Sequence, residues 1–298
     1  MLMNDVDAYL AIRRVAGFEL EVPEYLLRSY ASYAAQKGQD HVNAQTAIEW
    51  ASQAPSKNQR FNRLATAIRF ATHVQLEDPC HEIPPRGIFG NRRVRRVPFI
   101  FSTEQSDRFL LAATHLGPPK SLRPQTYSTL FGLLFATGLR ISEALALLFD
   151  DVTDDGLIIR KTKFKKSRIV PIQETTRVGL EKYLRCRSRI ATFDNHIFIS
   201  LRERVLQYSG VNWTFHRILK DIGLSPAPDG RCPRVHDMRH TFASYLAMTG
   251  EDIKAIMELM CHKSITSTMV YAKLSPEYLQ KVSNRFSFGP IPVKKNKQ

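Results

Sequence analysis

The C-terminal two thirds of the chain carry the side chains that phosphate-ester chemistry needs in the absence of a metal. Two guanidiniums can hold the non-bridging oxygens of a phosphate through paired hydrogen bonds. Imidazoles and a lysine can move protons, and a tyrosine hydroxyl can attack phosphorus to form a covalent ester. In chain order these residues are Arg140, Lys163, His236, Arg239, His262 and Tyr271.

Taken singly, each of these side chains has a more ordinary explanation. A lone histidine is more often structural than catalytic, a tyrosine on a terminal helix usually packs, and lysines in a hairpin turn usually face solvent. Arg140 is close enough along the chain to pair with Glu143. His236 and Arg239, however, are three residues apart and share one helical face. The ordered set indicates phosphate-ester chemistry more strongly than any member alone.

Helices and one hairpin are predicted to position this set. An apolar helix over 126–137 stops at Gly138, so Arg140 follows just beyond its end and the next helix begins two residues later. Two β-like runs, GLIIRKTK and SRIVPI, flank a short turn and predict a basic hairpin. Further helices are expected over 175–190, 211–223, 236–250 and 252–260, with a short strand at HIFIS.

The length of 298 residues predicts about two domains. We expect a helical domain over 1–85, a basic linker over 86–96, a second domain over 97–285 and a basic tail over 286–298. Prolines, glycines and an arginine cluster mark the linker. In the first domain, a helix beginning after Ser56 places basic residues mostly off its apolar stripe. These residues could form a solvated face or lie along phosphates.

The charge balance favours a polyanionic partner. Lys and Arg number 43 and Asp and Glu 28, which gives a net charge of +15, and a surplus of that size is most often matched to nucleic acid. The alternative is a merely basic protein of the ribosomal type. The longest uncharged stretch, 124–139, is shorter than the ~20 apolar residues of a membrane span and contains polar side chains. No secretory signal is visible, and four scattered cysteines without a C-x-x-C pair favour a reduced, cytoplasmic setting.

Four segments resemble the sequence boxes of the tyrosine recombinases, the phage-integrase and Xer-like family. ATGLRISEALAL resembles the first-arginine box, which contains Arg140, and TKFKKSRIVPI resembles the β-hairpin with a catalytic lysine. HDMRHTFASYLAMTG resembles the His-x-x-Arg box, and LMCHKSITSTMVYAKLS resembles the final box with His262 and Tyr271. The resemblance covers about 97–285, whereas the N-terminal region matches only in its helical character.

The resemblance leaves one assignment open and shows two departures. Lys163 matches the family's lysine best by its register against the proline, with Lys165 and Lys166 as alternatives. The family usually has glycine before its last histidine, where this chain has Cys261, so a position that needs positive φ would be strained. Tyr245 stands where many relatives have histidine, outside the catalytic set.

The resemblance implies a fold class and a reaction. The fold is expected to be mainly α with a small β-hairpin or sheet, an α+β class, in which a helical N-terminal domain and the catalytic domain form a two-domain clamp on DNA. Tyr271 would attack the scissile phosphate and form a 3′-phosphotyrosyl link, while Arg140 and Arg239 stabilise the charge on phosphorus. No metal, ATP or other cofactor would be needed.

Proton transfer and assembly are implied in the same way. His262 would donate a hydrogen bond to a non-bridging oxygen and Lys163 would protonate the 5′-oxygen. His236 would either position the phosphate or accept the tyrosine proton, and Glu143 would orient Arg140 or His236. The partners would be double-stranded DNA and a homo-tetramer on paired sites, alone or with related recombinases, with residues 275–288 docking on a neighbour. The expected location is the nucleoid of a bacterial cytoplasm, without a membrane.

The side chains expected to contact DNA share a positive charge and a place on the helix after Ser56, the linker or the hairpin. They are Lys57, Arg60, Arg63, Arg92, Arg93, Arg95, Arg96, Lys165, Lys166 and Arg168.

Three other functions are alternatives to a recombinase. A type IB topoisomerase-like enzyme shares the arginine, lysine, histidine and tyrosine chemistry, but the His-x-x-Arg box and the Xer-like residues around Arg140 argue against it. A catalytically silent DNA-binding accessory protein would not need all six residues. A metal-dependent nuclease or transposase would need a carboxylate cluster, which the sequence does not show at convincing spacing.

Overall fold

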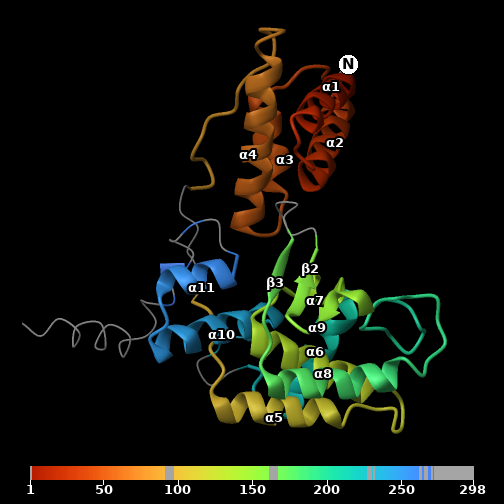
Figure 1. Cartoon of the computed structure of the whole chain (residues 1–298). Helices are drawn as coiled ribbons and strands as arrows, with labels where there is room; N and C mark the ends of the chain where they lie inside the picture. The colour runs from red at the N-terminus through yellow and green to blue at the C-terminus, as the bar shows by residue number, and fades with distance from the viewer. Residues whose placement is uncertain are drawn as a thin grey trace, which may run out of the picture. The chain divides into compact units, whose positions relative to one another are not determined.

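The computed structural model divides the chain into two compact units, Met1–Arg96 and Val97–Gln298, each described by itself (Figure 1). The residues that the structure describes are 2–90, 97–160, 167–226, 230, 232–261, 264, 268–269 and 271. Several predicted functional residues therefore lie outside the described residues. They are Arg92, Arg93, Arg95, Arg96, Lys163, Lys165, Lys166, His262, the docking segment 275–288 and the tail 286–298.

The N-terminal unit consists of helices α1 (Leu2–Val15), α2 (Glu21–Gln36), α3 (Ala44–Ser52) and α4 (Lys57–Val74). Polar caps start the last two helices, because the Asn43 side chain accepts from Thr46 N at 3.0 Å and the Ser56 side chain accepts from Gln59 N at 3.2 Å. Trp50 and Tyr30 pack in its core with ring centroids 5.3 Å apart. The predicted helix after Ser56 is confirmed.

The C-terminal unit is built around an apolar helix, as the sequence predicts. Helix α6 (Arg123–Thr137) contacts α5 (Thr103–Thr114), α8 (Glu174–Arg187) and α10 (Val235–Thr249). Its Phe131 lies edge-on to Phe109 of α5 with centroids 5.1 Å apart, and both rings contact Phe215 of α9 (Tyr208–Asp221). The remaining helices are α7 (Ile141–Leu145), the 3-10 turn η1 (Phe149–Asp151) and α11 (Ile253–Leu259). All of these elements except α11 contribute to one hydrophobic core. Ile256 of α11 packs in a second cluster with Ala243 and Ala247 of α10, Met260 and Tyr271.

A three-stranded antiparallel sheet accompanies the helices, in the order β1 (Val152–Thr153), β2 (Gly156–Ile159) and β3 (Arg168–Val170). The predicted hairpin is β2 paired with β3, with Leu157 opposite Val170 and Ile159 opposite Arg168. The two-residue strand β1 was not predicted. This register places Arg168 at the end of the pairing, and its guanidinium reaches Glu143 of α7.

The strand predicted at HIFIS is not formed as a strand. Its backbone bonds to two different segments instead, since Ile197 N donates to Leu147 O at 3.0 Å while Phe198 O accepts from Leu206 N at 3.1 Å. Only isolated bridges result, Leu148 with His196 and Ile199 with Val205. The apolar run is buried, but no single described strand pairs along its length.

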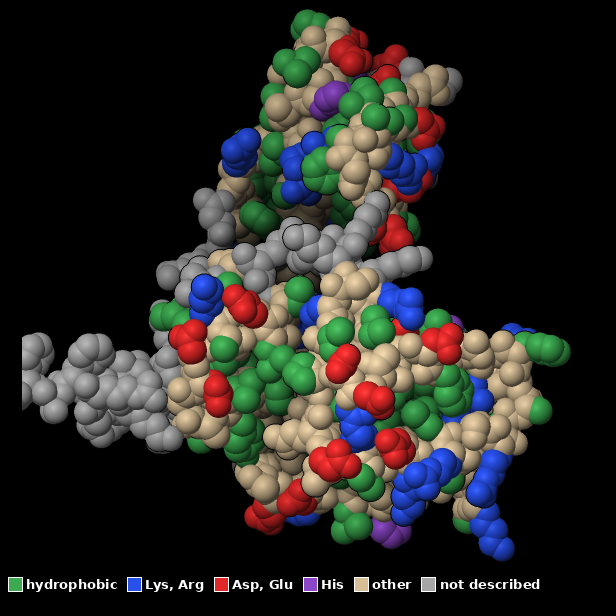
Figure 2. Space-filling view, viewed as in Figure 1, with side chains coloured by type: hydrophobic (Ala, Val, Ile, Leu, Met, Phe, Trp, Pro, Cys, Tyr) green, Lys and Arg blue, Asp and Glu red, His purple; other side chains and the backbone are tan. Residues whose placement is uncertain are grey.

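The described helices include none with both the length and the apolar character to cross a membrane. On the face of the C-terminal unit drawn in Figure 2, acidic and basic side chains are interspersed. This mixture of charges does not by itself mark a DNA-binding surface.

Candidate active site

A tight turn after α6 positions Arg140. Gly138 ends the helix in the left-handed conformation with φ +62°, and a Cβ at this position would lie 2.4 Å from Cδ1 of Phe242. Only glycine fits this turn without displacing the ring. Two residues later, Arg140 is the N-cap residue of α7, so its side chain projects from the start of that helix.

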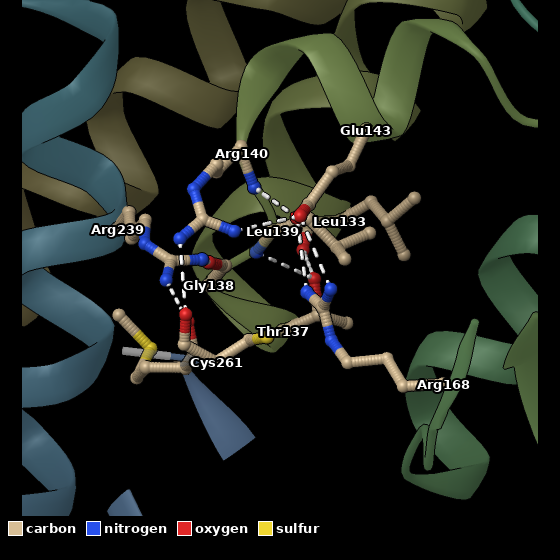
Figure 3. Close-up of polar contacts among 10 residues, drawn as sticks. Leu133, Thr137, Gly138, Leu139, Arg140, Glu143, Arg168, Arg239 and Cys261 are labelled. Carbon is tan, nitrogen blue, oxygen red and sulfur yellow. Dashed lines mark hydrogen bonds and ion pairs between the residues drawn. The ribbon is translucent and has the colours of Figure 1, made fainter. Parts of the chain in front are cut away.

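Glu143 fixes Arg140 at two places (Figure 3). Its carboxylate accepts the Arg140 backbone N–H at 2.9 Å and the Arg140 Nη1 at 2.8 Å. The same carboxylate accepts both terminal nitrogens of Arg168, at 3.1 Å and 3.0 Å. Burial raises the pKa of Glu143, but hydrogen bonds from Arg168 and Arg140 outweigh it and hold the pKa at about 2. The expectation that Glu143 orients Arg140 fits this geometry.

Arg239 is held differently, by backbone carbonyls. Its side chain projects from α10 into the protein, where the residue is only 3% exposed. Nη1 donates to Gly138 O and Nη2 donates to Met260 O (Figure 3). Burial, with repulsion from Arg140, lowers the pKa of Arg239 to about 10. The guanidinium therefore stays charged at neutral pH.

Consecutive carbonyls after α11 bring the two arginines together. Met260 O accepts from Arg239, and Cys261 O accepts from Arg140 Nη2 at 3.2 Å. Cys261 adopts φ +48°, the left-handed region that favours glycine. The strain that the sequence predicts for a non-glycine residue with positive φ is therefore located here. The turn aims successive carbonyls at the two guanidiniums.

Tyr271 lies beside this arginine pair. Its side chain is 2% exposed, and its phenol is close enough to Arg239 to act on that guanidinium electrostatically. The Oη atom lies 2.9 Å from Nδ1 of His240. Sequence reasoning missed His240, although it directly follows Arg239 and lies one helical turn after His236.

His236 occupies the rim of the site. Its ring stands edge-on to that of His240, with centroids 4.9 Å apart and an angle of 86°. The residue is exposed overall, and desolvation of its ring, followed by repulsion from His240 and Arg239, lowers the pKa of His236 to about 4. The imidazole is therefore neutral near pH 7.

Other members of the predicted set lie outside the described residues or in the N-terminal unit. Lys163 and His262 lie outside the described residues. Lys57, Arg60 and Arg63 are on α4 of the N-terminal unit, where two of the side chains are tied to the fold. Arg60 Nε donates to Ala54 O at 2.7 Å, and the Arg63 guanidinium donates to Trp50 O at 3.1 Å with its carbon 5.2 Å from the Trp50 ring centre. Their predicted contacts with DNA stay predictions.

The described part of the site offers cationic and proton-transferring groups. Two guanidiniums, a buried phenol and two imidazoles converge, and the one carboxylate among them is already bound by two arginines. Within the described residues, no group of three or more His, Cys, Asp and Glu side chains is arranged to hold a metal ion. The arrangement suits an anionic group with a phosphorus centre that the phenol could attack.

Comparison with known proteins gives consistent matches. The model of the phage integrase family matches residues 102–277. A Sinorhizobium fredii protein named as an integrase/recombinase, y4rB, is 33% identical over 302 residues, covering 94% of this chain and 95% of that protein. The tyrosine recombinase XerD of Bradyrhizobium diazoefficiens is 29% identical, covering 73% and 72%. Among solved structures, the Tn1549 transposon integrase in complex with transposon right end DNA has a TM-score of 0.70 at 19% identity, covering 95% of this chain and 99% of that one.

Proposed function

The chain belongs to the phage integrase family of tyrosine-type site-specific recombinases, and we propose that it cuts and rejoins double-stranded DNA through a 3′-phosphotyrosyl intermediate. One observation carries this proposal. Arg140 and Arg239 are paired on the consecutive carbonyls of Met260 and Cys261, with the phenol of Tyr271 beside them. That arrangement gathers two positive charges and a nucleophile, the groups that attack on a phosphate requires.

Cleavage is a single displacement at phosphorus. Oη of Tyr271 forms a bond to the scissile phosphorus as the bond from phosphorus to the 5′-oxygen breaks. Arg140 and Arg239 hold the non-bridging oxygens, whose charge grows in the transition state. The energy of the broken phosphodiester is kept in the phosphotyrosine, so the reaction uses no ATP and no metal.

The remaining roles follow the family resemblance. Lys163 protonates the departing 5′-oxygen, with Lys165 and Lys166 as alternatives, and His262 donates a hydrogen bond to a non-bridging oxygen. His236, neutral near pH 7, contributes to positioning the phosphate. A 5′-hydroxyl of a second strand then attacks the phosphotyrosine and releases Tyr271.

Strand exchange requires DNA on both sides of the active site and more than one copy of the protein. We propose that the N-terminal unit, through Lys57, Arg60 and Arg63, forms the other half of a clamp on DNA. Four copies on two paired sites would exchange strands, with residues 275–288 docking on a neighbour. A relative of similar fold is a transposon integrase solved on transposon-end DNA, which supports DNA as the partner. The activity would act on nucleoid DNA in a bacterial cytoplasm.

Covalent trapping tests the proposal directly. The protein is incubated with fragmented bacterial genomic DNA, denatured, washed free of non-covalent DNA, and the attached fragments are sequenced. We expect one sequence class to be enriched, linked to the protein through its 3′ end. Tyr271→Phe should bind DNA without attaching. Tyr245→Phe is the matched control, because Tyr245 also lies on the α10 side of the unit but its hydroxyl bonds to Phe101 O, so it should attach normally.

The alternatives give different results. A catalytically silent DNA-binding protein would yield no covalent adduct with any fragment. A type IB topoisomerase-like enzyme would relax supercoiled plasmid that lacks the recovered sequence, whereas a site-specific recombinase requires that sequence. Attachment that survives Tyr271→Phe would overturn the assignment of the nucleophile.

A further inference from the structure

The nucleophilic phenol has a partner that the six-residue set does not contain. Oη of Tyr271 and Nδ1 of His240 are 2.9 Å apart, a normal hydrogen-bond length, and the two ring centroids are 5.7 Å apart at an angle of 51°. Tyr271 is 2% exposed and His240 is half-buried. The contact is therefore largely sheltered from bulk water, where a proton transfer between the two groups does not compete with solvent.

The surroundings of His240 permit it to take up a proton. His236 faces it from one turn earlier on α10, and at neutral pH that ring carries no charge. Among the described residues, the charged groups that act on this cluster are Arg239 and Asp237 of α10 and Arg234 just before it, then Arg140, Glu143 and Arg168. The Arg239 charge opposes protonation of His240 until an anionic phosphate offsets it, so a bound phosphate favours the transfer.

We propose that His240 is the general base of the cleavage step, accepting the proton of the Tyr271 phenol. This inference rests on the proposed function and assigns to His240 the proton acceptance that the sequence leaves open at His236. It requires the Nδ1 nitrogen of neutral His240 to be the unprotonated one, with the proton on Nε2.

The proton and the bonds balance in both directions. As the bond from Tyr271 Oη to phosphorus forms and the bond from phosphorus to the 5′-oxygen breaks, the phenol proton passes to Nδ1 and the 5′-oxygen takes a proton from the general acid. In rejoining, the 5′-hydroxyl attacks phosphorus and gives its proton back to the general acid, the bond from phosphorus to Oη breaks, and His240 returns its proton to Oη. His240 is neutral before and after a complete cycle.

The test uses the full-length protein and a duplex carrying the sequence recovered by covalent trapping. The rate of adduct formation is measured in a single turnover at saturating DNA between pH 5 and 9. His240→Asn keeps a polar atom near the Nδ1 position without accepting a proton near neutral pH, and His240→Gln moves that atom to the Nε2 position. His216→Asn is the matched control, a histidine of α9 whose ring packs edge-on against Phe215.

We expect His240→Asn to lower the rate about a hundredfold, within the range of general base catalysis, with DNA affinity unchanged. The wild-type rate should fall on the acid side as His240 takes up a proton, and this fall should be absent in His240→Asn. His240→Gln should react more slowly than His240→Asn, because its amide is displaced from Oη. Thermal unfolding of each variant separates these effects from loss of fold.

A second substrate distinguishes the base from the acid. Replacing the bridging 5′-oxygen with sulfur gives a leaving group that departs without protonation, because thiols are far more acidic than alcohols. This DNA should restore the rate of Lys163→Ala but not that of His240→Asn. If wild type forms adduct and His240→Asn reacts within threefold of it with the same pH profile, His240 is not the base and only this inference fails. If wild type forms no adduct, the proposed function fails as well.

Discussion

The two arginines of the site are held by opposite means. Arg140, at the start of α7, is bound by a carboxylate that it shares with Arg168, and its side chain is 28% exposed. Arg239, on α10, is almost completely buried and donates to the carbonyls of Gly138 and Met260. Arg140 is ion-paired directly with a carboxylate, whereas Arg239 hydrogen-bonds to neutral carbonyls and Glu143 acts on it only electrostatically.

This difference indicates which charge a phosphate would complete. A buried charge held by neutral carbonyls is costly, and the lowered pKa of Arg239 reports that cost. A phosphate would place a negative charge in direct contact with Arg239, whose recorded hydrogen bonds go to carbonyls. Arg140 already has a direct ion pair with Glu143. We therefore expect Arg239 to contribute more to transition-state binding than Arg140.

Replacing each arginine by lysine gives the strongest test of whether Arg239 contributes more to transition-state binding than Arg140. Arg239→Lys should lower the rate of adduct formation about a thousandfold, the scale of losing a preorganised donor to a developing oxyanion, because one ammonium cannot serve two carbonyls and a phosphate. Arg140→Lys keeps its ion pair with Glu143 and should cost at least ten times less. Single-turnover adduct formation measures both.

A matched control separates phosphate binding from packing. Arg177 on α8 also donates to two backbone carbonyls, those of Thr153 and Asp154. Arg177→Lys should lower the free energy of unfolding without slowing adduct formation. Equal losses in Arg140→Lys and Arg239→Lys would contradict the comparison.

Removing the Glu143 carboxylate should leave Arg140, like Arg239, without a directly bound carboxylate. Glu143→Gln leaves the Arg140 and Arg168 guanidiniums facing each other without a negative charge. Since the folded pKa is about 2 against an ordinary 4.5, the carboxylate contributes about 3 kcal/mol of stability above pH 4.5. That contribution is lost as pH falls through 4.5 toward 2. Chemical unfolding at pH 7 and pH 3 measures this contribution. The difference in the free energy of unfolding between Glu143→Gln and wild type should be smaller at pH 3 than at pH 7.

The control for this change is Asp151→Asn, a buried carboxylate that binds Arg160 and caps Leu148 N away from the arginine pair. It should lower stability but leave the adduct rate intact, whereas Glu143→Gln should lower both. A gap between Glu143→Gln and wild type that is unchanged from pH 7 to pH 3 would show that the carboxylate does not stabilise the fold through its ionised form.

Arg168 also binds the Glu143 carboxylate, which bears on whether it contacts DNA. The sequence predicts a DNA contact here, yet its two terminal nitrogens bind Glu143 and its side chain is 15% exposed. Arg168→Gln should lower the free energy of unfolding by about 2 kcal/mol, the scale of a charged hydrogen bond, with DNA affinity at fixed salt little changed. If Arg168 instead contacts a phosphate, the slope of log binding constant against log salt concentration should be smaller in magnitude by about 0.9 in Arg168→Gln. The control is Arg160→Gln, which replaces an exposed arginine of the same hairpin.

These cases indicate what the sequence can and cannot predict. Helix ends and the order of the boxes were predictable, because capping residues, Gly138 and apolar spacing act locally. The role of Arg168 was not, because a basic run does not reveal that Glu143, 25 residues earlier, folds against it. His240 was missed because it lies next to Arg239 in a motif read for His236 and Arg239 alone. Its contact with Tyr271 joins residues 31 apart.

The same contrast applies to secondary structure. The hairpin of β2 and β3 follows from two alternating runs close in sequence, whereas β1 is too short to leave a pattern. HIFIS carries the composition of a strand, but whether it pairs along its length depends on segments around 147 and 206, which the local sequence does not specify.

The smallest expected effect tests the turn that joins both arginines. Cys261 has φ +48°, so Cys261→Gly removes a left-handed strain of about 1 kcal/mol or more but adds unfolded-state entropy of roughly 0.4–1 kcal/mol. We expect a net gain in the free energy of unfolding below about 1 kcal/mol, with the adduct rate unchanged because the Met260 and Cys261 carbonyls keep their places. Glu203→Gly, at another non-glycine residue with positive φ of 57°, should give a similar gain. A Cys261→Gly protein that gains stability but loses activity would mean that the strained turn itself, rather than its carbonyls alone, holds Arg140 against the phosphate.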